Sequence, residues 1–165
     1  TFSGTKNIGT DGGGQAVLKY SAAHQTGATG TIGIPSLEWD QYDIAVSGAS
    51  EGYDVSDTCP TLPIALPPDE ATTTLLTLVP HTNNSLRVQV RAVGGFALSG
   101  ASVRLTDGGY DETTTTSACG SAFFGGLSPS ATYTVETSIS GFLTDTLTNV
   151  DVSGNDATTI TLVTS

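Results

Sequence analysis

The second half of the sequence is divided into short runs in which apolar and polar residues alternate, and this pattern limits the fold more than any other feature. In the run 86–91, Leu, Val and Val alternate with Arg, Gln and Arg. A period of two residues places the apolar side chains on one face of a β-strand. Glycine pairs at 94–95, 108–109 and 125–126 separate the runs and favour turns. The expected strands are Leu86–Arg91, Ala101–Thr106, Asp111–Thr116, Ser121–Phe124, Thr132–Ser138, Thr144–Val152 and Thr158–Val163.

Seven short strands at this spacing predict a Greek-key β-sandwich, in which two sheets pack face to face. The composition agrees, because 37% of the residues are hydrophobic and only 13% are charged. No window has helix-forming residues at a period of 3.6, so we expect an all-β chain with almost no helix. The expected core residues of this sandwich are Val88, Val103, Leu105, Phe123, Leu127, Tyr133, Val135, Ile160 and Leu162.

The first half repeats the order of landmarks seen in the second half, at a distance of 90 or 91 positions. Ala28-Thr29-Gly30 leads into a short apolar strand, as Ala118-Cys119-Gly120 does. The matching landmarks are Gly30 and Gly120, Leu37 and Leu127, and Tyr42 and Tyr133. We therefore predict two tandem modules, residues 1–80 and 85–165, each an Ig-like Greek-key sandwich. The boundary falls at 80–84, where Pro80 interrupts a strand ladder and the two Asn residues favour a turn.

The first module lacks an opening strand in this alignment. Pairing Phe2-Ser3 with Val103-Arg104 leaves no counterpart of Leu86–Val90. Either an upstream segment was removed from a longer chain, which is the alternative we favour, or the strand comes from another chain. The start, without Met and without a signal-peptide pattern, agrees with a mature product or a fragment.

The net charge excludes some partners. Sixteen acidic residues against five basic ones give −11 at pH 7, which repels the phosphates of nucleic acids. The acidic residues are scattered, which is typical of a solubilising surface. No apolar run approaches the length of about 20 residues that crosses a bilayer, so we expect no direct membrane insertion.

Motifs of the second module resemble those of a known family. The quoted segments are Ala97–Leu105, Cys119–Phe124, Leu127, Tyr133–Val135 and Gly141-Phe142. They are similar to the carboxypeptidase regulatory-like domain, a transthyretin-like β-sandwich related to the Cna protein B-type repeats of surface adhesins. A further likeness, carried by Thr5–Thr10, Leu37–Tyr42 and Leu78–Thr82, is to tandem modules downstream of prepilin-type segments in uncultured bacteria. These resemblances imply a secreted, cell-surface or pilus-associated protein.

Cys59 and Cys119 are the only cysteines, one in each predicted module. In an exported protein they suggest one disulfide that ties the modules together. The alternative is two unpaired thiols, since the sequence does not reveal the separation of their Cα atoms. Neither His24 nor His81 belongs to a nucleophile motif, and we expect no catalytic residue and no enzyme activity. The second module has no lysine, so it cannot form the Lys–Asn isopeptide bond of related surface modules.

A ligand site is suggested only weakly. The six aromatic residues Trp39, Tyr42, Tyr53, Phe96, Tyr110 and Phe142 could stack on sugars, but most are expected to pack in the core, Tyr42 above all. Trp39 lies in an acidic turn, so Trp39 with Glu38 and Asp40 is the predicted ligand surface. Asp residues in turns usually cap their own backbone, and we expect no metal site and no cofactor.

Two functions remain open. The first is a non-catalytic structural or assembly module of a cell-surface or pilus-like appendage, whose partners are other protein subunits or its own removed N-terminal segment. The alternative is an adhesin module that binds carbohydrate or protein. Exposed aromatic residues would favour the alternative, and an open strand edge in the first module would favour the structural role.

Overall fold

The computed structural model describes the backbone of residues 1–165 and all side chains except those of residues 48, 49 and 131. The chain is all-β apart from one helical turn, α1 (Gly48–Glu51). It divides into two compact units, residues 1–47 with 60–75 and residues 48–59 with 76–165. The units differ from the predicted modules 1–80 and 85–165, because residues 48–59 and 76–80 belong to the second unit.

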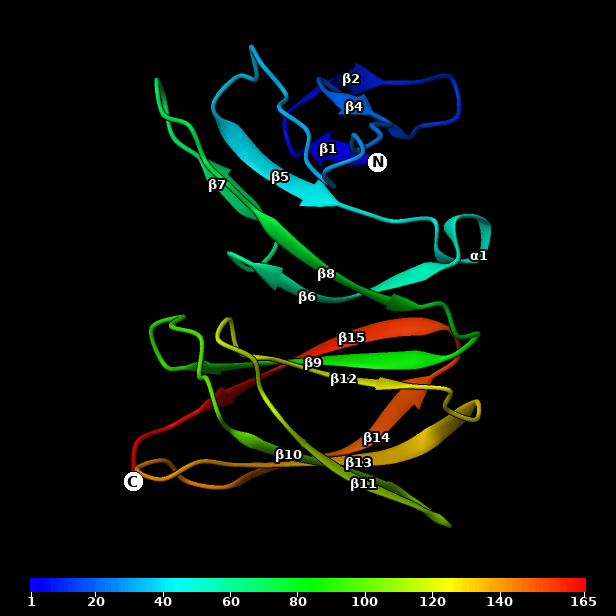
Figure 1. Cartoon of the computed structure of the whole chain (residues 1–165), viewed down its shortest axis with the longest axis vertical. Helices are drawn as coiled ribbons and strands as arrows, with labels where there is room; N and C mark the ends of the chain where they lie inside the picture. The colour runs from blue at the N-terminus through cyan, green and yellow to red at the C-terminus, as the bar shows by residue number, and fades with distance from the viewer. The chain divides into compact units, whose positions relative to one another are not determined.

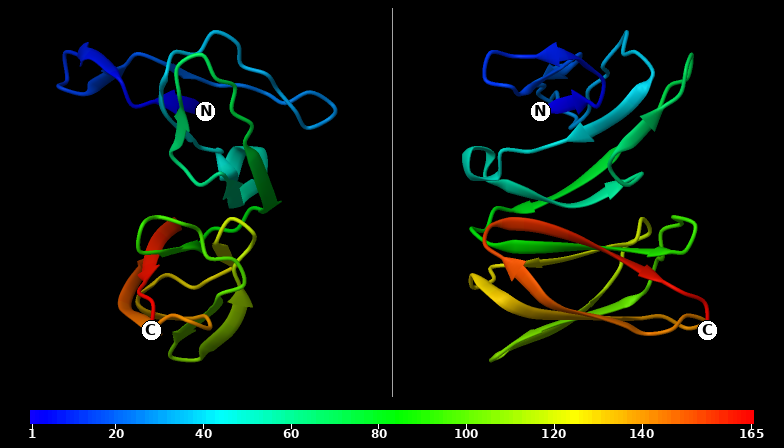
Figure 2. Two further views of the ribbon diagram at one scale, coloured as in Figure 1. Left: turned by 90° about the vertical axis from the view of Figure 1, so that its left-hand side faces the viewer. Right: turned by 180° about the vertical axis from the view of Figure 1, so that it is seen from behind.

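The second unit contains a closed β-sandwich, drawn in Figure 1 in green to red. One sheet has the order β12-β9-β15 and the other the order β11-β10-β13-β14. The strands are β9 (Ser85–Ala92), β10 (Ser102–Asp107), β11 (Tyr110–Thr115), β12 (Ser121–Gly125), β13 (Ser130–Ser138), β14 (Asp145–Val152) and β15 (Asn155–Leu162). All seven strands predicted for this region are confirmed, with ends that differ by three residues at most. Figure 2 shows the two sheets facing each other from behind and from the side.

The pairing of β9 closes the smaller sheet. β9 lies between β12, which is antiparallel to it, and β15, which runs parallel to it from Asn155 opposite Ser85 to Leu162 opposite Ala92. A parallel pair needs a long connection, and here the whole larger sheet intervenes in sequence between the two strands. The first and last strands of the sandwich are therefore hydrogen-bonded neighbours.

The core of the sandwich lies between the two sheets and follows the alternation in the sequence. Val88, Val103 and Val135 have no exposed surface. One of the expected core residues is wrong: Phe123 is partly exposed, whereas Phe124 is 1% exposed. In β12 the even-numbered residues Ala122 and Phe124 face the core, so Phe123 faces away.

Two more strands belong to the second unit although they precede the sandwich in sequence. β6 (Tyr53–Cys59) and β8 (Leu75–Pro80) form a two-stranded sheet. β6 lies beside β12 in the unit. β8 is part of the second compact unit from Leu76 onward.

The first unit has one four-stranded sheet and one hairpin. The sheet has the order β4-β1-β5-β7, and β2 pairs with β3. The strands are β1 (Phe2–Gly4), β2 (Asn7–Thr10), β3 (Ala16–Leu18), β4 (Ser21–Ala22), β5 (Asp40–Ile44) and β7 (Ile64–Leu66). The apolar strand expected after Gly30 is wrong, because residues 23–39 contain no strand. This segment is rich in Gly and polar residues, and Ile32 is 47% exposed, so it has no apolar face to bury.

The core of the first unit is small. Among the described side chains of this unit, Tyr42 and Ile64 are the buried apolar residues. The ring of Tyr42 stacks on Phe2 at 4.9 Å between centroids and meets Tyr20 edge-on at 6.0 Å. The expectation that Tyr42 packs in the interior is confirmed, and the rings of Phe2, Tyr20 and Tyr42 pack against one another.

Candidate functional site

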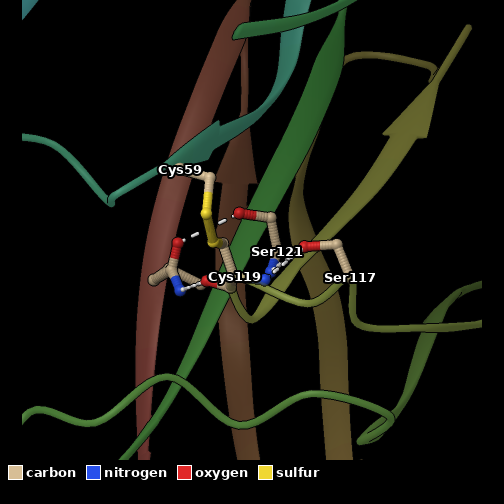
Figure 3. The surroundings of a disulfide bond; sticks show 5 residues. Cys59, Ser117, Cys119 and Ser121 are labelled. Atoms are coloured by element: carbon tan, nitrogen blue, oxygen red, sulfur yellow. Dashed lines mark hydrogen bonds between the residues drawn. A yellow bond between two sulfur atoms is a disulfide. The ribbon is translucent and has the colours of Figure 1, made fainter. Parts of the chain in front are cut away.

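Cys59 and Cys119 form a disulfide, with 5.5 Å between their Cα atoms. The bond joins the end of β6 to the turn between β11 and β12, and Figure 3 shows its surroundings. The predicted pairing is confirmed. The expected role differs, since both cysteines belong to the second compact unit, and the bond attaches β6 to the sandwich of that unit.

The turn that carries Cys119 is held by hydrogen bonds on both sides (Figure 3). Gln89 Nε2 donates to the Cys119 carbonyl at 2.8 Å, and Ser121 Oγ donates to Gln89 Oε1 at 3.0 Å. Ser117 Oγ accepts from the backbone N–H of Cys119 at 3.1 Å. Gly120 has φ +79°, and a Cβ there would lie 2.6 Å from the Val90 carbonyl oxygen. The turn thus requires glycine beside the cysteine.

A buried carboxylate fixes the other end of β6. Asp54 is 4% exposed, and its Oδ1 lies 2.7 Å from His81 Nδ1. Asn155 Nδ2 donates to the same oxygen at 2.7 Å, and the Thr82 backbone N–H donates to Oδ2 at 2.8 Å. Three partners compensate for the burial of the carboxylate, which would otherwise cost several kcal/mol. The cluster joins β6 to the segment after β8 and to the start of β15.

The face of β9 that points away from the core carries charged residues. Arg87 is partly buried there, and burial lowers the pKa of its guanidinium while the charge of Asp57 on β6 opposes that shift. Together with Asp54 and the disulfide, these residues form what we call the β6 anchor, defined as Asp54, Asp57, Cys59, His81, Arg87, Cys119 and Asn155. Within this set, Asp54 is hydrogen-bonded to His81 and Asn155, whereas the buried Oδ1 of Asp57 has no hydrogen-bond partner among the described residues.

The sequence did not point to the Asp54 cluster. His81 and Asn155 are 27 and 101 positions from Asp54, and neither forms a spaced motif with it. Only the pairing of β15 with β9 brings Asn155 close to Asp54. The sole local signal was the position of His81 directly after Pro80, at the predicted boundary.

Trp39, Glu38 and Asp40, the predicted ligand surface, lie together in the first unit. Trp39 is 56% exposed, and Lys6 Nζ lies 3.2 Å from the centroid of its ring and donates to its carbonyl. Glu38 forms ion pairs with Lys19 at 2.5 Å and with Lys6 at 3.8 Å. One face of the indole and the Glu38 carboxylate therefore already have partners.

The two carboxylates of this group have lowered pKa values. The hydrogen bond from Lys19 lowers the pKa of Glu38. For Asp40, burial raises the pKa, but hydrogen bonds from the Lys6 backbone, the Thr5 hydroxyl and the Gln41 backbone outweigh burial and lower it. Asp40 thus caps the first turn after β1, which is a structural use of the carboxylate.

The other aromatic residues divide between interior and surface. Tyr110 packs edge-on against Tyr133 at 6.0 Å between centroids, and Phe142 packs against the core. Phe96 and Tyr53 are 75% and 50% exposed, so the expectation that most of these rings are buried is wrong for them. Phe96 lies in the turn after β9, and Tyr53 is the first residue of β6, where alternation directs it away from the face of the buried Asp54.

A shallow polar hollow of about 550 Å³ lies beside the β10–β11 hairpin. Arg104 donates to Asp111 through Nε at 2.8 Å and Nη2 at 2.6 Å, and this pairing raises the pKa of Arg104 and lowers that of Asp111. Asp107 accepts from the Thr132 hydroxyl at 2.8 Å. Within the described part of the chain, no group of three or more His, Cys, Asp or Glu residues could hold a metal ion.

Comparisons with known proteins give a family match for part of the second unit. No curated protein has significant sequence similarity to the chain. Among solved structures, it is similar to the Bacillus anthracis TIE protein with a TM-score of 0.42 and 17% identity, covering 55% of this chain and 21% of that one. No helix in the described residues is long and apolar enough to cross a membrane. Residues 85–165, which form the closed sandwich, match the family model of the carboxypeptidase regulatory-like domain.

Proposed function

We propose that this chain is a non-catalytic structural module of an extracellular or cell-surface assembly, such as a pilus-like appendage. The observation that carries the proposal is the β6 anchor. A disulfide at Cys59 and the buried carboxylate of Asp54 fasten the same strand near its two ends.

The path of the chain supports a connecting role. The backbone passes from the first unit to the second after residue 47, returns after residue 59, and passes again after residue 75. Three covalent crossings resist separation of two units better than the single flexible linker found between independent domains. The disulfide agrees with an oxidising compartment, in which such bonds persist.

Pulling the chain from its two ends by single-molecule force spectroscopy tests this role. With the disulfide intact, residues 60–118 lie outside the path that carries force, because the crosslink closes a loop with a sequence separation of 60. Reduction of the bond should lengthen the fully extended chain by about 200 Å. It should also lower the force at which the second unit first yields, since β6 would lose one of its two fastenings.

A matched variant controls this experiment. Cys59→Ala with Cys119→Ala should behave like the reduced protein, whether or not reductant is present. Equal extension and equal yield forces for the oxidised and reduced chains would contradict a force-carrying role. Surface exposure on intact cells is checked separately by protease treatment followed by detection of the released chain.

An adhesin module that binds carbohydrate is the second candidate, favoured by the 56% exposure of Trp39. One face of the indole is covered by Lys6, so a sugar would stack on the other face or displace the lysine. A glycan array with the native chain and Trp39→Ala tests this candidate. Glycans that bind the native chain but not the variant would support carbohydrate binding at Trp39. An array in which no glycan binds the native chain would exclude this candidate.

A further inference from the structure

The turn between β8 and β9 leads into the triplet Asn83-Asn84-Ser85. An asparagine followed two positions later by serine or threonine, with any residue except proline between them, is the acceptor pattern for N-linked glycosylation in exported proteins. Of the five asparagines in the chain, Asn83 alone has a hydroxyl residue two positions later. The sequence therefore offers one side-chain amide as an acceptor for this modification.

The structure places Asn83 where a large group can be attached. Asn83 is exposed and lies in a bend outside both strands, and no hydrogen bond within the described residues involves its side chain. The amides of two other asparagines are in use, since Asn84 Nδ2 donates to the Leu127 carbonyl at 3.3 Å and Asn155 Nδ2 donates to Asp54 at 2.7 Å. A glycan on Asn83 therefore breaks no hydrogen bond of the described residues.

The hydroxyl of the same triplet is inaccessible once the chain has folded. Ser85 is 2% exposed, and its Oγ donates to Asn155 Oδ1 at 3.2 Å. Its backbone N–H donates to the Gly154 carbonyl at 2.9 Å, which fixes the start of β9 beside β15. Because the acceptor pattern includes this hydroxyl, a transferase has to reach the triplet while the chain is still extended. Modification therefore precedes the pairing of β9 with β15.

We propose that Asn83 is an N-glycosylation site that receives an oligosaccharide during export, before the second unit folds. The donor is an oligosaccharide joined through phosphate to a lipid. The amide nitrogen of Asn83 forms a bond to the anomeric carbon, the bond from that carbon to the phosphate oxygen breaks, the phosphate leaves with the bonding electrons, and the amide nitrogen loses one proton. Since the donor and the transferase act on exported chains, this inference rests on the proposed extracellular location.

A glycan at this turn limits how the module packs in an assembly. An oligosaccharide is bulky and hydrated, and burying its hydroxyl groups without hydrogen-bond partners costs free energy. The turn between β8 and β9 therefore faces solvent in the assembled state, and contacts with other subunits lie on other parts of the second unit. The glycan also lies two residues from His81, which contacts the buried Asp54.

Mass spectrometry of the chain purified from its native cells tests the site. A glutamate-specific protease and trypsin together cut after Glu70 and Arg87, and they release residues 71–87 as one peptide. Electron-transfer fragmentation leaves glycans attached and identifies the residue that carries them. We expect the mass of an oligosaccharide on Asn83. An unmodified peptide would overturn the proposal, and so would sugar found only on Thr72–Thr74, which would be O-linked.

Variants made in the same cells test the acceptor pattern. Asn83→Gln and Ser85→Ala should each lose the glycan completely, whereas Asn84→Gln and Ser85→Thr preserve the pattern and should keep it. Asn83→Gln changes an exposed side chain and should not alter the fold. Far-UV circular dichroism checks the Ser85 variants, because that side chain is buried. A glycan that persists in Asn83→Gln would contradict the assignment.

The order of modification and folding is tested with membranes from the native cells, which contain the donor and the transferase. A synthetic peptide of residues 80–88 should accept the oligosaccharide. The folded chain, produced without glycan in a host that lacks the transferase, should not accept it. Equal modification of both would show that folding does not hide Ser85. None of these outcomes alters the extension expected on reducing the disulfide, so this inference and the proposed structural role fail separately.

Discussion

Alternation along a strand decides which side chains of this protein are buried. A shift of one residue along the strand moves an aromatic ring from the core to the surface. Phe123 and Phe124 are neighbours in β12 with the same chemistry, yet Phe124 is 1% exposed and Phe123 is partly exposed. A strand directs successive side chains to opposite faces. The two phenylalanines therefore form a natural pair for measuring what burial contributes at one place in the fold.

Phe124→Ala should lower the free energy of unfolding by about 3–5 kcal/mol, because it leaves a cavity between the sheets. Phe123→Ala should cost about 1 kcal/mol, as is usual for a partly exposed site. Urea denaturation followed by far-UV circular dichroism measures both values. Equal losses in the two variants would show that the assignment of faces in β12 is incorrect.

Asp40 illustrates a carboxylate whose charge stabilises local structure. Its pKa is lowered in the folded protein from the ordinary value of 3.8. A lowered pKa means that the folded state favours the ionised form, so this contribution is complete above pH 3.8 and is lost as the pH falls through that value toward the folded pKa. Acid should therefore weaken the first unit.

We expect the urea concentration at the unfolding midpoint of the first unit to be lower at pH 3 than at pH 6. The fluorescence of Trp39, the single tryptophan, measures it. Asp40→Asn should lower the midpoint at pH 6 and show a smaller decrease in acid, because its side chain does not titrate. Asp43→Asn, at an exposed position of the same strand, should keep the native pH dependence. Identical pH profiles for native protein and Asp40→Asn would contradict this role.

At the scale of elements, β6 is held by specific polar and covalent bonds rather than by a large apolar face. Its inward positions Asp54, Ser56 and Thr58 are buried yet polar. Asp54 contacts groups from two other segments, and Cys59 is bonded to the turn before β12. The chain-entropy model gives a crosslink of this loop length about 4 kcal/mol of stabilisation. Loss of either the disulfide or the Asp54 hydrogen bonds should therefore allow β6 to unfold locally while the sandwich stays folded.

Asp54→Ala should remove a buried carboxylate, leave its three hydrogen-bond partners without it, and cost about 2–4 kcal/mol locally. Hydrogen exchange detected by mass spectrometry should accelerate in β6 and in residues 80–82, while β10 and β13 keep their protection. Asp151→Ala, which removes an exposed carboxylate from β14, serves as the control and should leave exchange in β6 unchanged. Uniform acceleration across the sandwich would mean that β6 and the core open together.

At the scale of the whole molecule, the two units have unequal cores. Among the described side chains, the second unit buries fifteen apolar residues in one cluster, whereas the first unit buries Tyr42 and Ile64. Hydrophobic burial is the main favourable term in folding. The first unit should therefore be the less stable of the two.

Unfolding in urea should not be a single transition. Trp39 fluorescence reports the first unit, and far-UV circular dichroism mainly reports the longer strands of the second unit. We expect the fluorescence midpoint to lie at lower urea than the circular dichroism midpoint, since fewer apolar groups hold the first unit together. Superimposable curves from the two probes would instead indicate one cooperative block.

The sequence by itself determined the strands of the second half. Alternation and glycine turns are properties of short segments, and they do not depend on which distant strands become neighbours. It also supplied the two cysteines that pair and the aromatic centre at Tyr42. It placed Phe123 in the core and a strand after Gly30, both wrongly, because a short apolar run does not reveal which face is covered.

Tertiary structure alone decided the rest. The assignment of residues 48–59 to the second unit, the Asp54 cluster and the pairing of β8 with β6 all depend on which distant strands become neighbours. Asn155 reaches Asp54 only because the last strand pairs with β9, the strand that opens the sandwich. Contacts between residues 101 positions apart leave no periodic trace in a single sequence, since each partner is compatible locally with many other environments.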